Sequence, residues 1–241
     1  MQANLITCKE VTVRYRYNPG GVHSVKDLLT HVTKPFQYKT ILHQLSFSLS
    51  RGESMGVLGR NGSGKSTLLR LLAGIIQPHQ GSCRVHGSIA PILALGVGLE
   101  PELTGYENIR LLLALYGVKL TTAKQDEVIS FSGLDPSTLR QPVKTYSSGM
   151  MARLAFSLSF AHDCDLYIID EVMAVGDMGF QVQCVEKIRA LQAAGKSLLF
   201  VSHFPDEVER YCGQAILLDE GRLIDLGSSA DVCAHYRQLF A

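Results

Sequence analysis

The sequence lacks an apolar run long enough to cross a bilayer, and it carries almost no net charge. Its longest candidate, Ile89 to Leu99, is shorter than the roughly 18 residues of a membrane-spanning segment and is interrupted by Pro91 and Gly96. The formal net charge of +1 gives no bulk attraction to nucleic acid or to anionic lipid. These features argue against an integral membrane protein, and we expect no nucleic-acid partner.

Cysteines at metal-ligand spacing and a secretory leader are missing as well. The six cysteines are scattered and include no C-x-x-C pair. We therefore expect reduced, buried thiols rather than a zinc site or a disulfide framework. The first ten residues, MQANLITCKE, contain no basic segment followed by an apolar stretch, so we expect no signal peptide and a cytosolic protein.

The sequence does contain a series of short apolar runs that alternate with helical patterns. The near-continuous apolar runs at Leu166–Ile169 and Ser197–Val201 are typical of parallel strands covered on both faces. A helical pattern from about 181 to 194 lies between them and completes a strand–helix–strand unit. The stretch from about 101 to 162 is helical and has no strand-like run. We therefore predict an α/β fold with a parallel sheet and an inserted helical subdomain.

Residues 59–67 read GRNGSGKST and match the pattern G-x-x-x-x-G-K-[ST] without a substitution. An apolar run precedes them and a strong helix former follows, which is the context of a phosphate-binding loop rather than of a chance glycine turn. Glycines let successive N–H groups point at an anion, Lys65 can reach the β- and γ-phosphates, and the Ser66 hydroxyl can bind Mg²⁺. We expect a nucleoside triphosphate to be held by Gly59, Arg60, Asn61, Gly62, Ser63, Gly64, Lys65, Ser66 and Thr67.

Two carboxylates, Asp170 and Glu171, follow the apolar run at Leu166–Ile169. In P-loop enzymes an aspartate at this strand end lies beside Mg²⁺. An acid one residue later can polarise the attacking water, which contributes on the order of 10²–10⁴-fold to the rate. Acidic residues are common at strand ends, so the pair is informative because it accompanies the phosphate loop. We predict Asp170 as a metal ligand and Glu171 as the catalytic base.

The segment Tyr146-Ser147-Ser148-Gly149-Met150 precedes a helical pattern. With the phosphate loop and the Asp-Glu pair, its order and spacing resemble the nucleotide-binding subunit of ATP-binding-cassette (ABC) transporters over nearly the whole chain. The family signature LSGGQ matches at Ser147 and Gly149 and differs at the other three positions. The resemblance implies that Ser147, Ser148 and Gly149 face the γ-phosphate of ATP held by the opposite subunit, and hence a head-to-tail homodimer. The alternative is an ordinary serine cap at a helix start.

The same resemblance implies a fold. The family has a P-loop NTPase core with a parallel sheet, an N-terminal antiparallel β portion and an inserted helical subdomain. Residues 1–241 then form a single ABC ATPase domain, with the α/β core at 1–94 and 163–241 and the helical subdomain at 95–162.

The resemblance also assigns the remaining site residues. Asp177 falls where the family carries its D-loop aspartate, and His203 falls where it carries the switch histidine that contacts the γ-phosphate. Tyr15 fits the aromatic residue that stacks on adenine, and Tyr17 is the alternative because it shares the same face of the strand. The catalytic roles are those of Glu171, His203 and Lys65, and the metal ligands are Ser66 and Asp170.

One element of the family is missing. No glutamine occurs between Gly81 and Lys124, whereas the family carries one in the loop between core and subdomain, where it senses Mg²⁺ and contacts the transport partner. The stretch 93–108 has the form L-x-x-G-x-G-x-x-P-E-L-T-G-x-E-N. It resembles a narrower branch that exports bacterial cell-surface polysaccharides such as O-antigens, capsules and teichoic acids. Which group replaces the glutamine stays open, with Glu100 as one candidate.

An insert at 19–38 supports the same branch. Apolar residues recur there at helical spacing, Ser24 can cap the start, and Pro35 ends the pattern. One interpretation is a helix packed on the core, and the other is an amphipathic helix at the membrane face, near where the polymer enters.

These observations lead to one function with two alternatives. We expect an ATPase that uses ATP and Mg²⁺ and is peripheral at the cytoplasmic face of the inner membrane. It drives a separate integral membrane permease that exports a lipid-linked cell-surface polysaccharide. The alternatives are the ATPase of another ABC transporter and a soluble ABC ATPase with no role in transport. Because the sequence ends one short helix after the hairpin at 215–226, we also expect no C-terminal β-sandwich that reads the polymer end.

Overall fold

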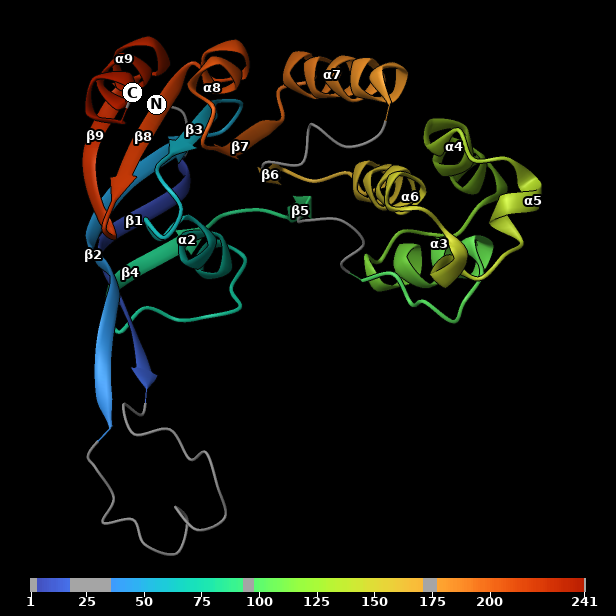
Figure 1. Cartoon of the computed structure of the whole chain (residues 1–241), viewed down its shortest axis with the longest axis horizontal. Coiled ribbons are helices and arrows are strands. Elements are labelled where there is room, and N and C mark those ends of the chain that lie inside the picture. Colours follow the sequence, from blue (N-terminus) through green and yellow to red (C-terminus); the bar gives the residue numbers. More distant parts are fainter. Residues whose placement is uncertain (1–3, 18–35, 93–97, 171–176, 241) are drawn as a thin grey trace, which may run out of the picture.

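The computed structural model describes residues 4–17, 36–92, 98–170 and 177–240, and Figure 1 shows how their helices and strands are arranged. The strands are β1 (Asn4–Tyr17), β2 (Gln37–Ser50), β3 (Ser54–Leu58), β4 (Gln80–Val85), β5 (Ile89–Ile92), β6 (Leu166–Asp170), β7 (Ser197–Ser202), β8 (Gln214–Asp219) and β9 (Arg222–Ser228). The helices are α2 (Lys65–Leu72), α3 (Gly105–Leu115), α4 (Thr122–Ser132), α5 (Pro136–Leu139), the 3₁₀ helix η1 (Val143–Thr145), α6 (Ser148–Ala161), α7 (Met178–Ala193), α8 (Pro205–Tyr211) and α9 (Ser229–Phe240). None of the helices in these ranges is long and apolar enough to cross a membrane.

Six strands form the central sheet in the order β5-β6-β7-β3-β8-β9. The first five in this order are parallel, and β9 is antiparallel to β8. The turn between β8 and β9 has positive φ at both Glu220 and Gly221, as a two-residue hairpin loop prefers. Every residue of β7 is buried, as expected for a parallel strand covered on both faces. The strands predicted at 166–169 and 197–201 and the hairpin at 215–226 are therefore confirmed, and the apolar run before the phosphate loop forms β3.

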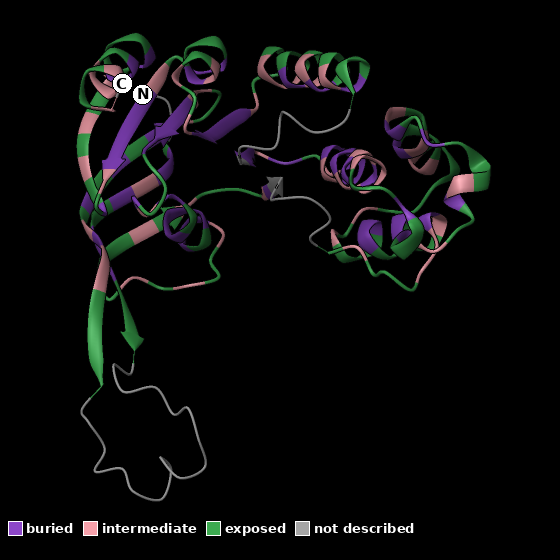
Figure 2. Ribbon diagram, in the orientation of Figure 1, coloured by how far each residue is buried: buried purple, intermediate pink, exposed green. Residues whose placement is uncertain are grey.

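A second, antiparallel sheet has the strand order β2-β1-β4. Its inner face shares one apolar core with the central sheet and α2, in which Leu5, Leu45 and Leu69 are buried. The hairpin of β1 and β2 extends beyond this core, and its far end is exposed (Figure 1, Figure 2). The predicted N-terminal antiparallel β portion is thus confirmed.

The end of the predicted insert at 19–38 differs from the structure. Gln37 and Tyr38 belong to β2 and pair with β1, so the strand begins inside the range that was assigned to the insert. A cross-strand contact favours this extension, since Tyr17 Oη donates to Gln37 Oε1 at 2.7 Å. The helix expected at about 24–34 lies outside the described residues.

Helices α3 to α6 lie beyond β5 and β6 from the antiparallel sheet (Figure 1) and have an apolar core of their own. Leu113 of α3 and Leu154 of α6 are fully buried in it. Helix α6 also joins this group to the central sheet, because Phe156 packs edge-on against Phe180 of α7. The inserted helical part predicted by the sequence is therefore confirmed.

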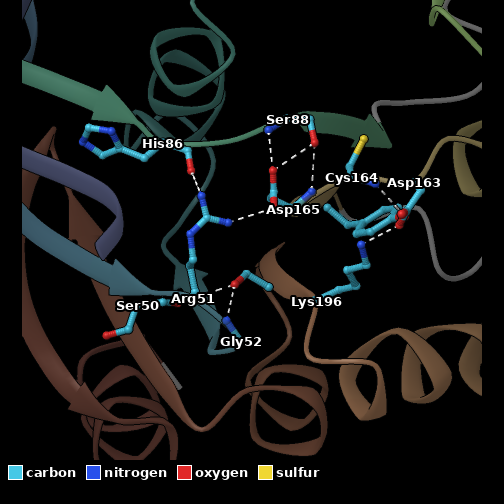
Figure 3. A network of polar contacts seen from close by, with 11 residues as sticks. Ser50, Arg51, Gly52, His86, Ser88, Asp163, Cys164, Asp165 and Lys196 are labelled. Carbon is cyan, nitrogen blue, oxygen red and sulfur yellow. Dashed lines mark hydrogen bonds and ion pairs between the residues drawn. The ribbon is translucent and has the colours of Figure 1, made fainter. Parts of the chain in front are cut away.

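A network of polar contacts fastens the starts of the parallel strands to one another (Figure 3). Arg51, which precedes β3, donates to the Asp165 carboxylate at 2.8 Å and to the backbone oxygen of His86. The same carboxylate accepts from the Ser88 backbone N–H at 2.8 Å. The Ser88 N–H holds the pKa of the Asp165 carboxyl below its ordinary value, and Arg51 adds to this effect. The starts of β3, β5 and β6 are thereby fixed, so the loops at their other ends leave the sheet from set positions.

Candidate nucleotide-binding site

Three of the predicted site segments follow neighbouring strands of the central sheet. The loop 59–64 follows β3, Asp170 ends β6, and His203 comes directly after β7. Because β6, β7 and β3 are adjacent and parallel, their carboxyl ends meet at one edge of the sheet, where α/β proteins bind ligands. The structure therefore brings these three segments together.

The backbone of the loop between β3 and α2 requires glycine at Gly62 and Gly64, among other positions. Gly62 has a φ of +84° and Gly64 a φ of +106°, a region that residues with a side chain rarely adopt. A Cβ atom at Gly64 would lie 2.7 Å from Leu42 Cδ2 and 3.3 Å from Ile41 O, so the loop packs directly on β2. A Cβ atom at Gly62 would have no neighbour within 4 Å. The backbone at Gly62 therefore faces open space.

Lys65, the first residue of α2, bridges the two ends of the loop through its side chain. Its Nζ donates to Gly59 O at 2.5 Å and to Arg60 O at 3.2 Å, and the side chain is buried. The loop is fixed further at Ser63, whose N–H donates to Arg60 O at 3.1 Å and whose O accepts from the Gly221 N–H at 2.9 Å. The loop thus holds a positive charge at the start of a helix, which is a preorganised site for an anion.

A cavity of about 410 Å³ opens over this loop. Its wall from β2 contains a lysine, and its floor is formed by the loop and the first turn of α2. All charged side chains among its described lining residues are cationic, so the cavity favours a polyanion such as a triphosphate. The lining residues are Lys39, Ile41, Arg60, Asn61, Gly62, Gly64, Lys65, Ser66 and Thr67.

The residues present fit a triphosphate with a bound divalent cation. Ser63 Oγ is buried and has no hydrogen-bond partner within the described part of the chain. A buried hydroxyl without a partner is costly, and a phosphate oxygen can accept from it. Ser66 is exposed in the first turn of α2, where its hydroxyl is accessible to a cation.

The register of the hairpin distinguishes the two candidate tyrosines. Tyr15 pairs with Lys39, a residue of the cavity wall, and directly paired residues of antiparallel strands point to the same face. Tyr17 pairs with Gln37 and is bonded to its side chain. Tyr15 therefore lies beside the cavity, and Tyr17 is two residue pairs farther out along the hairpin.

His203 lines a second cavity, of about 500 Å³, which shares Arg60, Asn61 and Gly62 with the first. The bend that carries it is fixed by Ser202, whose Oγ accepts from the Phe204 N–H at 3.0 Å and donates to Glu207 Oε2 at 2.7 Å. The His203 ring packs on the Phe204 ring, with 3.8 Å between their centroids. This cavity is lined by Arg60, Asn61, Gly62, Ser63, His203, Asp219, Glu220 and Tyr236.

The first of the two predicted carboxylates, Asp170, ends the strand next to β7. Asp170 is the last residue of β6 and pairs with Val201. Glu171 lies outside the described residues, as do 172–176. The roles of Asp170 as a metal ligand and Glu171 as a base therefore stay predictions.

The signature residues lie on a different part of the molecule. Ser147 caps α6, and its Oγ accepts from the Met150 N–H at 3.2 Å. Ser147 and Ser148 are exposed, and a Cβ atom at Gly149 would have its nearest neighbour, Ser147 Oγ, at 3.9 Å. In Figure 1, α6 lies beyond β5 and β6 from α2. The structure therefore does not bring the signature to the phosphate loop of the same chain.

Asp177 also caps a helix, and it is not among the described residues that line the two cavities. Its Oδ1 accepts from the Phe180 N–H at 3.0 Å, and its Oδ2 pairs with Arg153 of α6. The Phe180 N–H holds the pKa of the Asp177 carboxyl below its ordinary value, and Arg153 adds to this effect. This cap explains why α7 begins at Met178, before the start predicted at about 181.

Sequence reasoning missed several of the lining residues. Lys39 and Ile41 reach the cavity because β2 crosses the phosphate loop, and Tyr236 reaches the second cavity from α9. The turn at Asp219-Glu220 lies there because β8 is next to β3. No local motif marks these residues, and only the hairpin register and the strand order reveal them.

This fold and this site define a P-loop nucleotide-binding protein, and comparison with known proteins identifies the family. The family model described as ABC transporter matches residues 42–174. The O-antigen export system ATP-binding protein RfbB of Klebsiella pneumoniae is 41% identical, over 98% of this chain and 99% of its own length. The teichoic acids export ATP-binding protein TagH of Listeria monocytogenes is 35% identical, over 96% of this chain and 69% of its own length.

Solved structures share the fold. The ATP-binding subunit of an ABC transporter superposes with a TM-score of 0.76 at 24% identity, over 98% of this chain and 95% of that one. A dimeric ATP-binding cassette in a post-hydrolysis state, bound to ADP and Pi, superposes with a TM-score of 0.75 at 19% identity, over 93% of this chain and 98% of that one.

The chain belongs to the ABC transporter family. It is an ATPase of that family, so the predicted family, fold and enzyme class are confirmed. The narrower resemblance is confirmed as well, since curated relatives at 35–41% identity are ATP-binding proteins of O-antigen and teichoic acid export systems.

Proposed function

We propose that this chain is the ATP-hydrolysing subunit of an exporter that moves a lipid-linked cell-surface polysaccharide across the cytoplasmic membrane. The observation that carries the proposal is its 41% identity to an O-antigen export ATP-binding protein over 98% of the chain. The subunit works at the cytoplasmic face of the inner membrane, bound to a separate integral membrane permease that holds the polymer. It has no nucleic-acid partner.

ATP binds in the cavity over the phosphate loop. Lys65 and the loop N–H groups contact the β- and γ-phosphates, and Tyr15 stacks on adenine. The support for Tyr15 over Tyr17 is its register opposite Lys39 in the cavity wall.

Hydrolysis uses the three strand ends that meet at this edge. Ser66 and Asp170 would hold Mg²⁺, which would neutralise charge on the phosphates. Glu171 polarises the attacking water and accepts its proton, and His203 donates a hydrogen bond to the γ-phosphate. Lys65 stabilises the charge that develops on the departing phosphate oxygens.

The active unit is a head-to-tail homodimer. In the division that we propose, the core at 1–94 and 163–241 carries the phosphate loop, and the helical subdomain at 95–162 carries the signature. Ser147, Ser148 and Gly149 are at an accessible helix start away from their own phosphate loop. They contact ATP bound by the second copy, and Asp177 lies at the same dimer interface.

The two alternatives are less well supported. An ATPase of another ABC transporter would be expected to carry a glutamine before Glu100, and a soluble ABC ATPase would be expected to resemble proteins outside transport. The curated relatives at 35–41% identity are instead named as parts of export systems.

The proposal is tested with the purified chain and its Glu171→Gln variant. We expect the variant to bind ATP as tightly as the wild type, to lose at least about 100-fold in kcat, and to form a stable dimer with ATP. Glu186→Gln, an exposed change on α7, is the matched control and retains the wild-type rate. Hydrolysis by Glu171→Gln near the wild-type rate would refute the assignment of the base. A wild-type chain that hydrolyses no ATP would refute the proposed function.

A further inference from the structure

We infer that two chain segments form one latch that positions the signature serine, Ser147, and that Asn108 holds this latch together. The latch consists of Asn108, the loop Glu100–Thr104 and the segment Pro142–Thr145. The inference rests on the proposed function, since the position of Ser147 affects hydrolysis only where it contacts ATP across the dimer. Asn108, Glu102 and Lys144 are positioning residues and do not touch the nucleotide.

Asn108 of α3 is fully buried, and its amide is saturated with hydrogen bonds to the loop. Its Oδ1 accepts from the Glu100 N–H at 2.7 Å. Its Nδ2 donates to three backbone oxygens, those of Glu100 at 3.0 Å, Leu103 at 3.2 Å and Thr104 at 3.0 Å. A primary amide has both donors and acceptors, so neither an apolar side chain nor a carboxylate can replace all of these bonds. One side chain thus sets the shape of the whole loop.

The loop is joined in turn to the segment that precedes the signature. The Val143 N–H donates to Leu103 O and the Lys144 N–H to Pro101 O, both at 2.9 Å. Lys144 Nζ also pairs with Glu102 Oε2 at 2.6 Å. Backbone and side-chain bonds therefore couple the two segments, which are far apart in the sequence.

Tyr146 carries the coupling to the signature. Its N–H donates to Val143 O at 2.9 Å, its ring is buried, and its Oη donates to Thr138 O at 2.9 Å. A Cβ atom at Gly105 would lie 2.3 Å from Tyr146 Oη, so the start of α3 packs directly against this side chain. Ser147 is the next residue. Its position therefore depends on α3 and the loop as well as on α6.

A loosened latch should affect the rate of hydrolysis and leave ATP binding unchanged. ATP is bound by the phosphate loop of the core, which the latch does not contact in the described structure, so a loosened latch should leave ATP affinity unchanged. Misplacement of a group that acts in the transition state lowers the rate, and a shift of about 1 Å can cost on the order of 10²-fold. A variant of the latch should therefore show a lower kcat at an unchanged KM.

The test compares Asn108→Ala with Val128→Ala in the full-length chain. Val128 is buried in the apolar cluster that also contains Val143 and Tyr146, and it takes part in none of the hydrogen bonds of the latch, so it controls for lost stability. We expect Asn108→Ala to lower kcat about 10-fold or more and to change KM for ATP less than about 2-fold. We also expect faster hydrogen exchange at the Met150 N–H, which Ser147 caps. Val128→Ala should leave both kcat and the hydrogen-exchange rate at the Met150 N–H unchanged.

A surface pair provides a second comparison that does not depend on the folding of Asn108→Ala. Lys144→Gln breaks the ion pair within the latch, and Lys124→Gln breaks a similar exposed pair with Glu127, at 2.7 Å, on α4. We expect a lower kcat and faster exchange at Met150 for Lys144→Gln and wild-type values for Lys124→Gln. The inference would be overturned if Asn108→Ala had the same kcat and the same exchange rate at Met150 as Val128→Ala, and Lys144→Gln the same values as Lys124→Gln. A wild-type chain without ATPase activity would contradict the proposed function instead. The exchange rates at Met150 in the variants and their controls would still show whether the latch positions Ser147.

Discussion

At the scale of single residues, the two tyrosines of β1 show what a local pattern cannot resolve. Tyr15 and Tyr17 share one face of the strand, so alternation alone left both as candidates for the adenine contact. The register favours Tyr15, because Tyr15 pairs with Lys39 of the cavity wall and Tyr17 pairs with Gln37. Register depends on the partner strand, which lies outside any local motif.

This distinction leads to a prediction about ATP affinity. A base stacked on an aromatic ring is worth about 1–3 kcal/mol, so Tyr15→Ala should raise the Kd for ATP about 5- to 150-fold. Tyr17→Ala is the matched control and should change the Kd less than about 3-fold, while Tyr15→Phe should retain most of the affinity because the ring remains. The measurement is a titration with a fluorescent ATP analogue. A larger loss for Tyr17→Ala than for Tyr15→Ala would reverse the assignment.

The phosphate loop was predictable from the sequence because its function depends on neighbouring backbone groups. Gly62, Gly64 and Lys65 act within one turn of chain, and the motif therefore contains most of the geometry. The cation at Lys39 was not predictable, since it reaches the loop from another strand. Asp177 was predicted for its place in the family, and the structure adds its local role as the cap of α7.

At the scale of elements, the central sheet depends on contacts at the starts of its strands. Arg51 and Ser88 precede β3 and β5, and both contact the Asp165 carboxylate ahead of β6 (Figure 3). A Cβ atom at Gly87 would lie 2.5 Å from Asp165 Oδ2, so the segment before β5 packs closely on this carboxylate. The network acts at the edge opposite to the nucleotide site and keeps the strands in place.

This carboxylate makes stability depend on pH. The pKa of Asp165 is lower in the folded chain than in the unfolded chain. Its contribution is therefore complete above the ordinary carboxyl pKa of about 4 and is lost as the pH falls through the folded value. Asp165→Asn should lower the free energy of unfolding by about 1 kcal/mol at pH 7, after allowance for solvent screening, and the difference should shrink below about pH 4.

The measurement is thermal unfolding of both proteins across this pH range. Asp163→Asn is the control, because Asp163 is 83% exposed and pairs only at the surface with Lys196. It should change the melting temperature less than Asp165→Asn does. A difference between wild type and Asp165→Asn that grows toward low pH would contradict the account.

Most of the elements were predictable where burial produces a simple pattern. The strands β6 and β7 are covered on both faces and appear in the sequence as continuous apolar runs. The antiparallel sheet is harder to predict, because β1 and β2 have several register shifts and alternate only in part. The continuation of β2 back to Gln37 could not be predicted, since it depends on cross-strand contacts with β1 rather than on its own residues.

At the scale of the whole molecule, the nucleotide site and the signature belong to different parts of the chain. The phosphate loop lies between β3 and α2, and the signature begins α6 beyond β5 and β6 (Figure 1). Local motifs identified both the phosphate loop and the signature. Only the arrangement of the elements shows that the two are apart within one chain. A second copy completes the site in the function that we propose, and the latch around Asn108 sets where the signature meets it.

The measurement that tests the central claim most directly is the amount of surface polysaccharide on cells that carry the permease but lack their own copy of this gene. The wild-type chain should restore the surface polymer. Glu171→Gln, produced at the same level and found at the membrane in the same amount, should leave the polymer inside the cell, because hydrolysis at this site drives export. Restoration by Glu171→Gln to the wild-type level, or failure of the wild-type chain to restore any polymer, would contradict the account.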